Sequence, residues 1–248
     1  MKKAILMLTM LITGASLSGC IVNFNGNGYN YDGADKYHVF DGTIQGSFTK
    51  LDIGWVSGDV TVVRGDSFSV TEIIGGNDAP EYRMRYCFDG KTLKIKYAAS
   101  GIQLASGMRK SLKIVVPFEL DKIKVDSVSA DVTVEGIAAD DVDINTVSGA
   151  AVLSDVAVHN IDMDTVSGNV SIKPGNEASE IDISTVSGSV VATFDESASF
   201  TAKFNSVSGR FTSEIPTIVD GKYYIAGDGR ATEIDCDTVS GSFAVKKG

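Results

Sequence analysis

Through its middle the chain reads Ile161-Asp162-Met163-Asp164-Thr165-Val166-Ser167-Gly168-Asn169-Val170-Ser171-Ile172. Apolar residues alternate with polar ones along this stretch, first at odd positions from Ile161 and then at even positions from Val166. Strand side chains point to opposite faces in turn, so a change of parity requires a corner or a bulge. The stretch therefore predicts two short strands joined by a bend, with small Ser-Gly residues at the corner and Val166 facing inward.

The same pattern recurs along most of the chain. Val-Ser-Gly or a near variant begins at Val56, Val128, Val147, Val166, Val186, Val207 and Val239. In the central run the units are about 20 residues long, which is enough for one turn of a solenoid. A single turn cannot bury its apolar side, but stacked turns bury a continuous core. We therefore predict an all-β parallel β-solenoid over residues 40–248, with Val147, Val166 and Val186 in one inward column. A β-sandwich is the alternative.

Two segments interrupt the repeat. Residues 66–118 separate the first unit from the others and read as an antiparallel β insertion, with Asp89-Gly90 as a hairpin turn. Residues 212–233 stand before the last unit. Because solenoid ends expose unpaired strand edges, we expect such segments to cover them.

The N-terminus reads as a secretory signal. Lys2 and Lys3 precede an uncharged, mostly apolar run that is too short to span a bilayer. The following Leu17-Ser18-Gly19-Cys20 resembles a bacterial lipobox, which implies a signal peptide over residues 1–19 and acylation of Cys20. The alternative is an ordinary cleavable signal with a chance cysteine. We expect a protein of the bacterial cell envelope, lipid-anchored in the outer membrane.

Residues 20–39 are rich in Gly and Asn and lack a helical period, so they are typical of a flexible tether. The alternative is that one or two of their aromatic residues pack against the folded body. Of the remaining cysteines, Cys87 alternates away from the apolar face of its strand, whereas Cys236 faces a core. These opposite settings argue against a disulfide between them.

The net charge of −10 disfavours nucleic acid and anionic membrane surfaces as partners. A zinc site would need more donors than His38 and His159, which lie far apart in the sequence and are expected at the surface. The repeated serines have no general base near them in the sequence, so we interpret them as corner residues. We expect no cofactor and no catalytic residues.

The Thr-Val-Ser-Gly units, the Lys113-Ile114-Val115-Val116-Pro117 strand and the closing unit from Gly229 to Val245 resemble the bacterial putative-adhesin family. That family is a β-strand-repeat group of unknown function, similar to the head GIN domain proteins. The resemblance covers about residue 40 to the end of the chain. It implies a repeat architecture and an envelope location, and it implies no particular activity.

Carboxylates follow the repeat on the outward side. One predicted column holds Asp143, Asp162, Asp182 and Asp235, and the next holds Asp126, Asn145, Asp164, Ser184, Asn205 and Asp237. We interpret them mainly as solvated acids that keep the sheet from pairing with others. A calcium column formed by Asp143, Asp162, Asp164 and Asp182 is a weaker alternative, and a carbohydrate-cleaving pair is the weakest.

These observations predict a non-enzymatic envelope lipoprotein. The protein is attached to the membrane through the lipid anchor at Cys20. Its solenoid surface serves for adhesion to an envelope or extracellular protein or polysaccharide. Two other classes of function remain open at this point, a carbohydrate-active β-solenoid enzyme and a structural protein that assembles through its solenoid ends.

Overall fold

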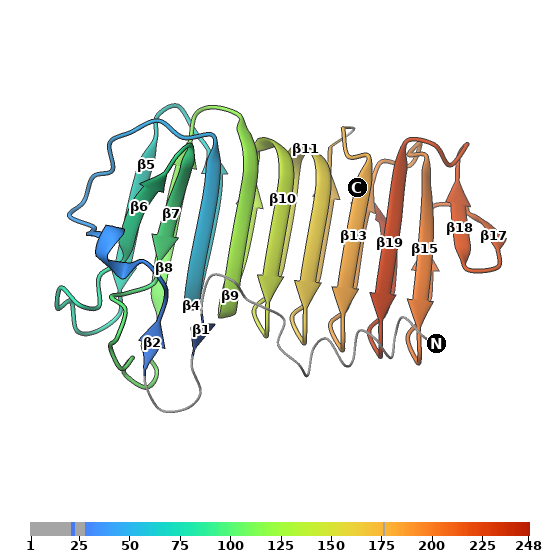
Figure 1. The fold of residues 1–248 in the computed structure, drawn as a ribbon. Helices are drawn as coiled ribbons and strands as arrows, with labels where there is room; N and C mark the ends of the chain where they lie inside the picture. The colour runs from blue at the N-terminus through green and yellow to red at the C-terminus, as the bar shows by residue number, and fades with distance from the viewer. Residues whose placement is uncertain (1–20, 23–27, 176) are drawn as a thin grey trace.

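A computed structural model describes residues 21–22, 28–175 and 177–248. The fold is all-β, with one short 3-10 turn at Ala34–Lys36. Figure 1 shows an elongated, two-layered stack of strands, in which each layer is a largely parallel sheet. The predicted parallel β-solenoid is confirmed. The signal peptide and Cys20 lie outside the described residues.

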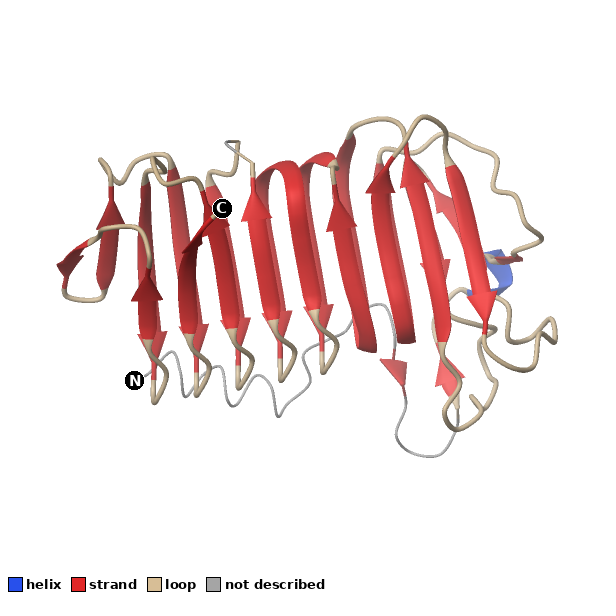
Figure 2. Ribbon diagram, turned by 180° about the vertical axis from the view of Figure 1, so that it is seen from behind, coloured by secondary structure: helices blue, strands red, loops and turns tan. Residues whose placement is uncertain are grey.

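We call the layer that faces the viewer in Figure 1 the front sheet and the layer seen from behind in Figure 2 the back sheet. Several long strands bend at a corner and contribute to both sheets. In spatial order, the front sheet contains β7 (Thr92–Lys96), the first part of β4 (Lys50–Arg64), the first part of β9 (Leu120–Glu135), β10 (Ala138–Thr146), the second part of β11 (Ala151–Thr165), β13 (Glu180–Thr185), β19 (Thr232–Thr238) and β15 (Phe200–Ser206). The back sheet contains β8 (Lys110–Val116), the remaining parts of β4, β9 and β11, then β12 (Val170–Pro174), β14 (Val190–Phe194), β20 (Phe243–Lys247) and β16 (Phe211–Ser213).

The turns of the solenoid do not follow chain order at either end. The β4 turn lies between the β7–β8 turn and β9, although β7 and β8 come later in the chain than β4. Likewise the last unit, β19 and β20, inserts between β13–β14 and the earlier β15–β16. The C-terminus consequently ends inside the stack, where the Gly248 N–H donates to the Phe194 carbonyl over 3.0 Å.

Antiparallel strands extend both ends. At the N-terminal end β5 (Ser69–Ile74) pairs with β8, and β6 (Arg85–Asp89) pairs with β7 and with β3 (His38–Val39). At the other end β18 (Tyr223–Ala226) pairs with β15, and β17 (Ile218–Asp220) pairs with β18. The expected antiparallel pairing over residues 66–118 is present, including the hairpin at Asp89-Gly90 that joins β6 to β7. The segment is more than an antiparallel insertion, because β7 and β8 also run parallel to β4 and form a solenoid turn of their own.

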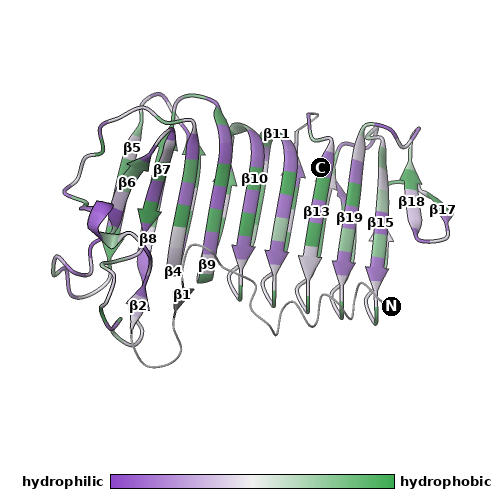
Figure 3. Cartoon of the chain, in the orientation of Figure 1, coloured by the Kyte–Doolittle hydropathy of each residue, from purple (hydrophilic) through white to green (hydrophobic). Residues whose placement is uncertain are grey.

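The core lies between the two sheets. Inward side chains stack in register from turn to turn, for example Val125, Ile144, Met163, Ile183 and Cys236, each no more than 1% exposed. Figure 3 shows the resulting alternation of apolar and polar bands across the strands. As predicted, Cys236 faces this core.

Four corners are held by a threonine, and those at Val128 and Val207 are held by a serine in the same position. The Thr165 hydroxyl oxygen accepts the Gly168 N–H over 2.9 Å, and Thr146, Thr185 and Thr238 repeat this bond to their own glycines. All four threonines are buried, so each threonine still belongs to the alternating set of inward side chains. The alternation shifts by one residue only after the threonine. The prediction that Val147, Val166 and Val186 face inward is wrong, because these valines occupy the bend itself and are only half-buried.

The corner glycines allow neighbouring turns to approach closely. A Cβ at Gly168 would lie 2.0 Å from the Gly149 carbonyl oxygen, and one at Gly188 would lie 1.9 Å from the Gly168 oxygen. The serine before each glycine donates to the valine carbonyl of the adjacent turn, as Ser167 does to Val147 over 3.3 Å. The predicted role of Ser-Gly as corner residues is confirmed.

Residues 28–39 pack on the body, in contrast to the expected tether over residues 20–39. Tyr29 is 1% exposed, and its hydroxyl oxygen accepts the Tyr97 N–H over 3.1 Å. The Tyr29 main chain also bonds to Gly101 and Ile102. β1 (Ile21–Val22) pairs with β2 (Tyr29–Asn30). The aromatic side chains gain more from burial at the end of the solenoid than the chain gains from remaining free.

Candidate functional site

The front sheet carries the predicted carboxylate columns. The register places Asp143, Asp162, Asp182 and Asp235 side by side on adjacent strands. We call these four residues the Asp ladder. The second predicted column is also formed, in the spatial order Asp126, Asn145, Asp164, Ser184, Asp237 and Asn205.

Lysines neutralise the two ends of the Asp ladder. Lys124 Nζ lies 3.2 Å from Asp143 Oδ2 at one end, and Lys203 forms an ion pair with Asp235 at the other. Both lysines occupy the same column as the acids. The role of Lys203 is not apparent from the sequence, because the last unit lies between β13 and β15, out of chain order.

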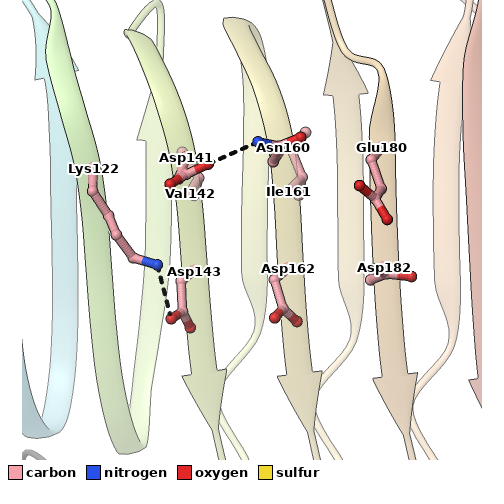
Figure 4. Close-up of a pocket in the computed structure, with 9 residues that line it drawn as sticks. All are labelled: Lys122, Asp141, Val142, Asp143, Asn160, Ile161, Asp162, Glu180 and Asp182. Carbon is pink, nitrogen blue, oxygen red and sulfur yellow. Dashed lines mark hydrogen bonds and ion pairs between the residues drawn. The ribbon is translucent and has the colours of Figure 1, made fainter.

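The middle of the Asp ladder has no such neutralisation within the part of the chain that the structure describes. The ion pairs along the ladder engage its end members, Asp143 and Asp235, but neither Asp162 nor Asp182. Figure 4 shows these two carboxylates on neighbouring strands, with Glu180 near Asp182 and with Lys122 directed at Asp143 instead. Together with Asp141 and Asn160 they line a shallow hollow of about 220 Å³.

This crowding changes the ionisation of the ladder. Although Asp162 is exposed as a residue, partial desolvation of its carboxyl on the crowded sheet face, followed by the charges of Asp164, Asp143 and Asp182, raises its pKa to about 6. Partial desolvation is also the largest cause of the raised pKa of Asp182 and of Asp164, which are likewise exposed. The front sheet therefore holds negative charge at an energetic cost, which a cation bound there would relieve.

We expect this cost to appear in the pH dependence of stability. The folded-state pKa of Asp162 lies above its unfolded value of 3.8, so the folded state binds more protons between about pH 4 and pH 6. Stability should fall as the pH rises through that window. Asp162→Asn should raise the melting temperature at about pH 7 and make stability less dependent on pH across this window.

Asp143→Asn is the matched control, because it removes a carboxylate that is paired with Lys124. Thermal unfolding followed by circular dichroism across the window measures both variants. An Asp162→Asn protein with an unchanged pH profile would show that the ladder is fully solvated.

The donors for a metal site are not brought together. Within the described residues, no three His, Cys, Asp or Glu side chains form a group that could hold a metal ion. The candidate calcium residues Asp143, Asp162, Asp164 and Asp182 present their oxygens from one side of a sheet, whereas calcium requires six to eight surrounding oxygens. His38 and His159 are exposed, as predicted.

The two remaining cysteines are free thiols. Cys87 lies outside the core cluster, yet it is only 6% exposed. Tyr37, from the segment expected to be a tether, forms a hydrogen bond with it, and burial raises the pKa of the thiol.

A buried ion pair lies at the N-terminal end of the solenoid. Lys110 Nζ is 2.6 Å from Glu72 Oε1, and the two side chains are 0% and 4% exposed. This pair was not predicted, although the sequence contains a signal for it. Lys110 shares the parity of inward Leu112 and Ile114, and Glu72 shares that of Val70 and Ile74.

Family comparison agrees with this architecture. Residues 45–246 match the family model described as Toastrack DUF4097. The chain belongs to the Toastrack DUF4097 family. The predicted resemblance to the β-strand-repeat adhesin group is thereby confirmed. A comparison with curated proteins returns no match.

Solved structures similar to this Toastrack chain share little sequence with it. A "putative cell adhesion protein" from Clostridium sporogenes is 14% identical, with a TM-score of 0.48 and coverage of 86% of this chain and 98% of that one. A "putative adhesin" from Bacteroides fragilis is 15% identical, with a TM-score of 0.41 and coverage of 86% and 96%. Another from Parabacteroides distasonis is 14% identical, with a TM-score of 0.37 and coverage of 86% and 95%.

Proposed function

We propose that this Toastrack protein is a non-enzymatic, lipid-anchored envelope protein whose front sheet binds a ligand that carries cationic groups. The observation that carries the proposal is the unneutralised middle of the Asp ladder, Asp162 and Asp182, beside Glu180. Strand spacing of about 4.8 Å presents these carboxylates at a regular repeat. Such a surface suits an envelope or extracellular protein or polysaccharide with amine or guanidinium groups.

The contacts of the repeated serines support a binding role over catalysis. Ser148, Ser167 and Ser187 each donate to a main-chain carbonyl of the adjacent turn, so their hydroxyls stabilise the corner. A carbohydrate-cleaving enzyme needs one acid and one base or nucleophile with different roles. The Asp ladder instead repeats one residue type at equivalent register positions. Absence of turnover on a panel of polysaccharides would agree with this proposal.

Lipid anchoring is the first testable part of the proposal. The described residues include no helix long and apolar enough to cross a membrane. If acylation provides the attachment, Cys20→Ala should move the protein from the membrane pellet to the supernatant in detergent-free fractionation, because the acyl chains would be lost. Unchanged sedimentation of Cys20→Ala as an integral protein would contradict the anchor.

Ligand binding is tested separately, with poly-L-lysine as the probe. Asp162→Asn combined with Asp182→Asn should weaken binding several-fold. The matched control, Glu119→Gln with Asp195→Asn, removes the same charge from exposed loops and should have little effect. Equal losses in both double variants would mean that net charge alone attracts the probe.

A further inference from the structure

The exposed large apolar side chains are confined to the two ends of the solenoid in the described part of the chain. Four lie at the end formed by β5 and β6: Val39, Ile73, Phe88 and Phe118. Four lie at the opposite end, formed by β17 and β18: Val207, Ile218, Val219 and Tyr223. The central turns expose none of comparable size. Exposed apolar residues that gather at particular places mark interaction surfaces more often than scattered ones do.

The N-terminal end offers a groove beside an open strand edge. Among the described residues, β5 has six residues and pairs only with β8. Its single charged residue, Glu72, points inward to Lys110, so β5 itself presents no outward charge of the kind usual for edge strands. A groove of about 450 Å³ runs beside it. Phe40, Ile73 and Ile74 form its apolar lining, and Asp41 and the Asp78–Arg83 ion pair form much of its polar lining.

The opposite end of the solenoid offers a projecting hairpin, formed by β17 and β18, with a complementary strand edge. Within the part of the chain that the structure describes, β17 pairs only with β18, and its Ile218 and Val219 are 71% and 60% exposed. Figure 1 shows this hairpin at the far end of the stack from β5. An apolar strand with one free edge is the kind of occupant that an open strand edge beside apolar side chains binds.

Charges around the two features are also complementary. Exposed Asp41 lines the groove, and exposed Arg109 lies at the end of β5, where its carbonyl accepts the Gly75 N–H over 3.2 Å. The hairpin turn carries exposed Asp220 and Lys222. Apart from the mutually neutral Asp78–Arg83 pair that also lines the groove, Asp41 and Arg109 at one end can therefore meet Lys222 and Asp220 at the other.

We propose that this protein assembles head to tail, with β17 of one copy seated in the groove along β5 of the next. The contact joins two different surfaces of identical chains, so it is heterologous, and it builds a linear array along the solenoid axis. β17 is short and the apolar contact is small, so the contact should be weak and dependent on concentration. The proposal does not depend on the ligand of the front sheet.

Thiol cross-linking of the full chain tests this arrangement. Ile73→Cys and Ile218→Cys are made separately and treated with a short bismaleimide, singly and mixed. The native thiols Cys87 and Cys236 are 6% and 0% exposed, and the parent chain sets the background. We expect a cross-linked dimer from the mixture and none above background from either variant alone.

Two further variants sharpen the test. Adding Val219→Glu to the Ile218→Cys chain should reduce the dimer yield several-fold, whereas Val207→Glu, at the same end but outside β17, should not. Ser171→Cys, on a central strand, should not replace Ile73→Cys. Dimers from either single variant alone, or no dimer from the mixture, would overturn the head-to-tail arrangement.

Discussion

Glu72→Gln should lower the free energy of unfolding by about 3–5 kcal/mol, because it leaves the Lys110 ammonium buried without its counter-charge. The Glu72 carboxylate accepts a hydrogen bond from Lys110 Nζ over 2.6 Å and another from the Met84 N–H over 2.9 Å. Lys110 in turn donates to the carbonyl oxygens of Tyr82 and Tyr97. One ion pair thus joins β5, β8 and the segments that close this end of the solenoid.

The aromatic surroundings add to the cost of losing Glu72. Lys110 Nζ lies 4.9 Å from the centre of the Trp55 ring and 4.2 Å from that of Tyr97. Burial already lowers the pKa of Lys110 to about 8, although Glu72 acts in the opposite direction. Without the carboxylate, the charged form would be held by ring faces and two carbonyls alone.

Replacing both partners separates the charge effect from packing. Glu72→Met with Lys110→Met removes both charges and should recover much of the stability lost in Glu72→Gln, since the buried pair itself contributes little net energy. Asp89→Asn, in the exposed pair with Lys94, should lower the free energy of unfolding far less. Denaturant unfolding measures all three. A Glu72→Gln loss no larger than that of Asp89→Asn would contradict a structural role for the buried pair.

Gly188→Ala should destabilise the protein by about 3 kcal/mol or more, because the new Cβ meets main chain that cannot move aside alone. It would lie 1.9 Å from the Gly168 carbonyl oxygen and 2.9 Å from the carbonyl carbon. Relief requires two turns of the solenoid to separate, which breaks the parallel ladder on both sides of the corner.

Ser187→Ala provides the control at the same corner. It removes only an exposed hydroxyl that donates to the Val166 carbonyl over 3.4 Å, so its cost should be near 0.5 kcal/mol. Thermal and denaturant unfolding of the two variants give the comparison. Similar losses would show that the turns can spread at the corner and that glycine is not required there.

Much of the fold could be predicted from local patterns. The regular spacing of Val-Ser-Gly fixes the length of a turn, and alternation fixes which side of each strand faces the core. The outward columns follow from the same alternation, since Asp162 and Asp182 occupy equivalent positions between two apolar neighbours. The corner threonine was not recognised, because a side chain that accepts the Gly168 N–H can be buried without being apolar.

The candidate site was predictable only in part. The columns of acids are repeated in the sequence, whereas their neutralisation depends on which turns are neighbours. Lys203 pairs with Asp235 although 32 residues separate them, and Lys124 pairs with Asp143 across the boundary between two turns. The repeat pattern alone therefore could not predict that the unneutralised charge lies at Asp162 and Asp182.

By itself the sequence determined the all-β class, the length of the solenoid turn and the outward position of the carboxylates, because these follow from strand alternation between near neighbours. Only the tertiary structure decided the order of the turns, the packing of residues 28–39 and the burial of Cys87 beneath Tyr37. Those features depend on which distant segments can cover an open end. Burial of apolar surface and pairing of free strand edges determine that choice, and both act between residues far apart in the chain.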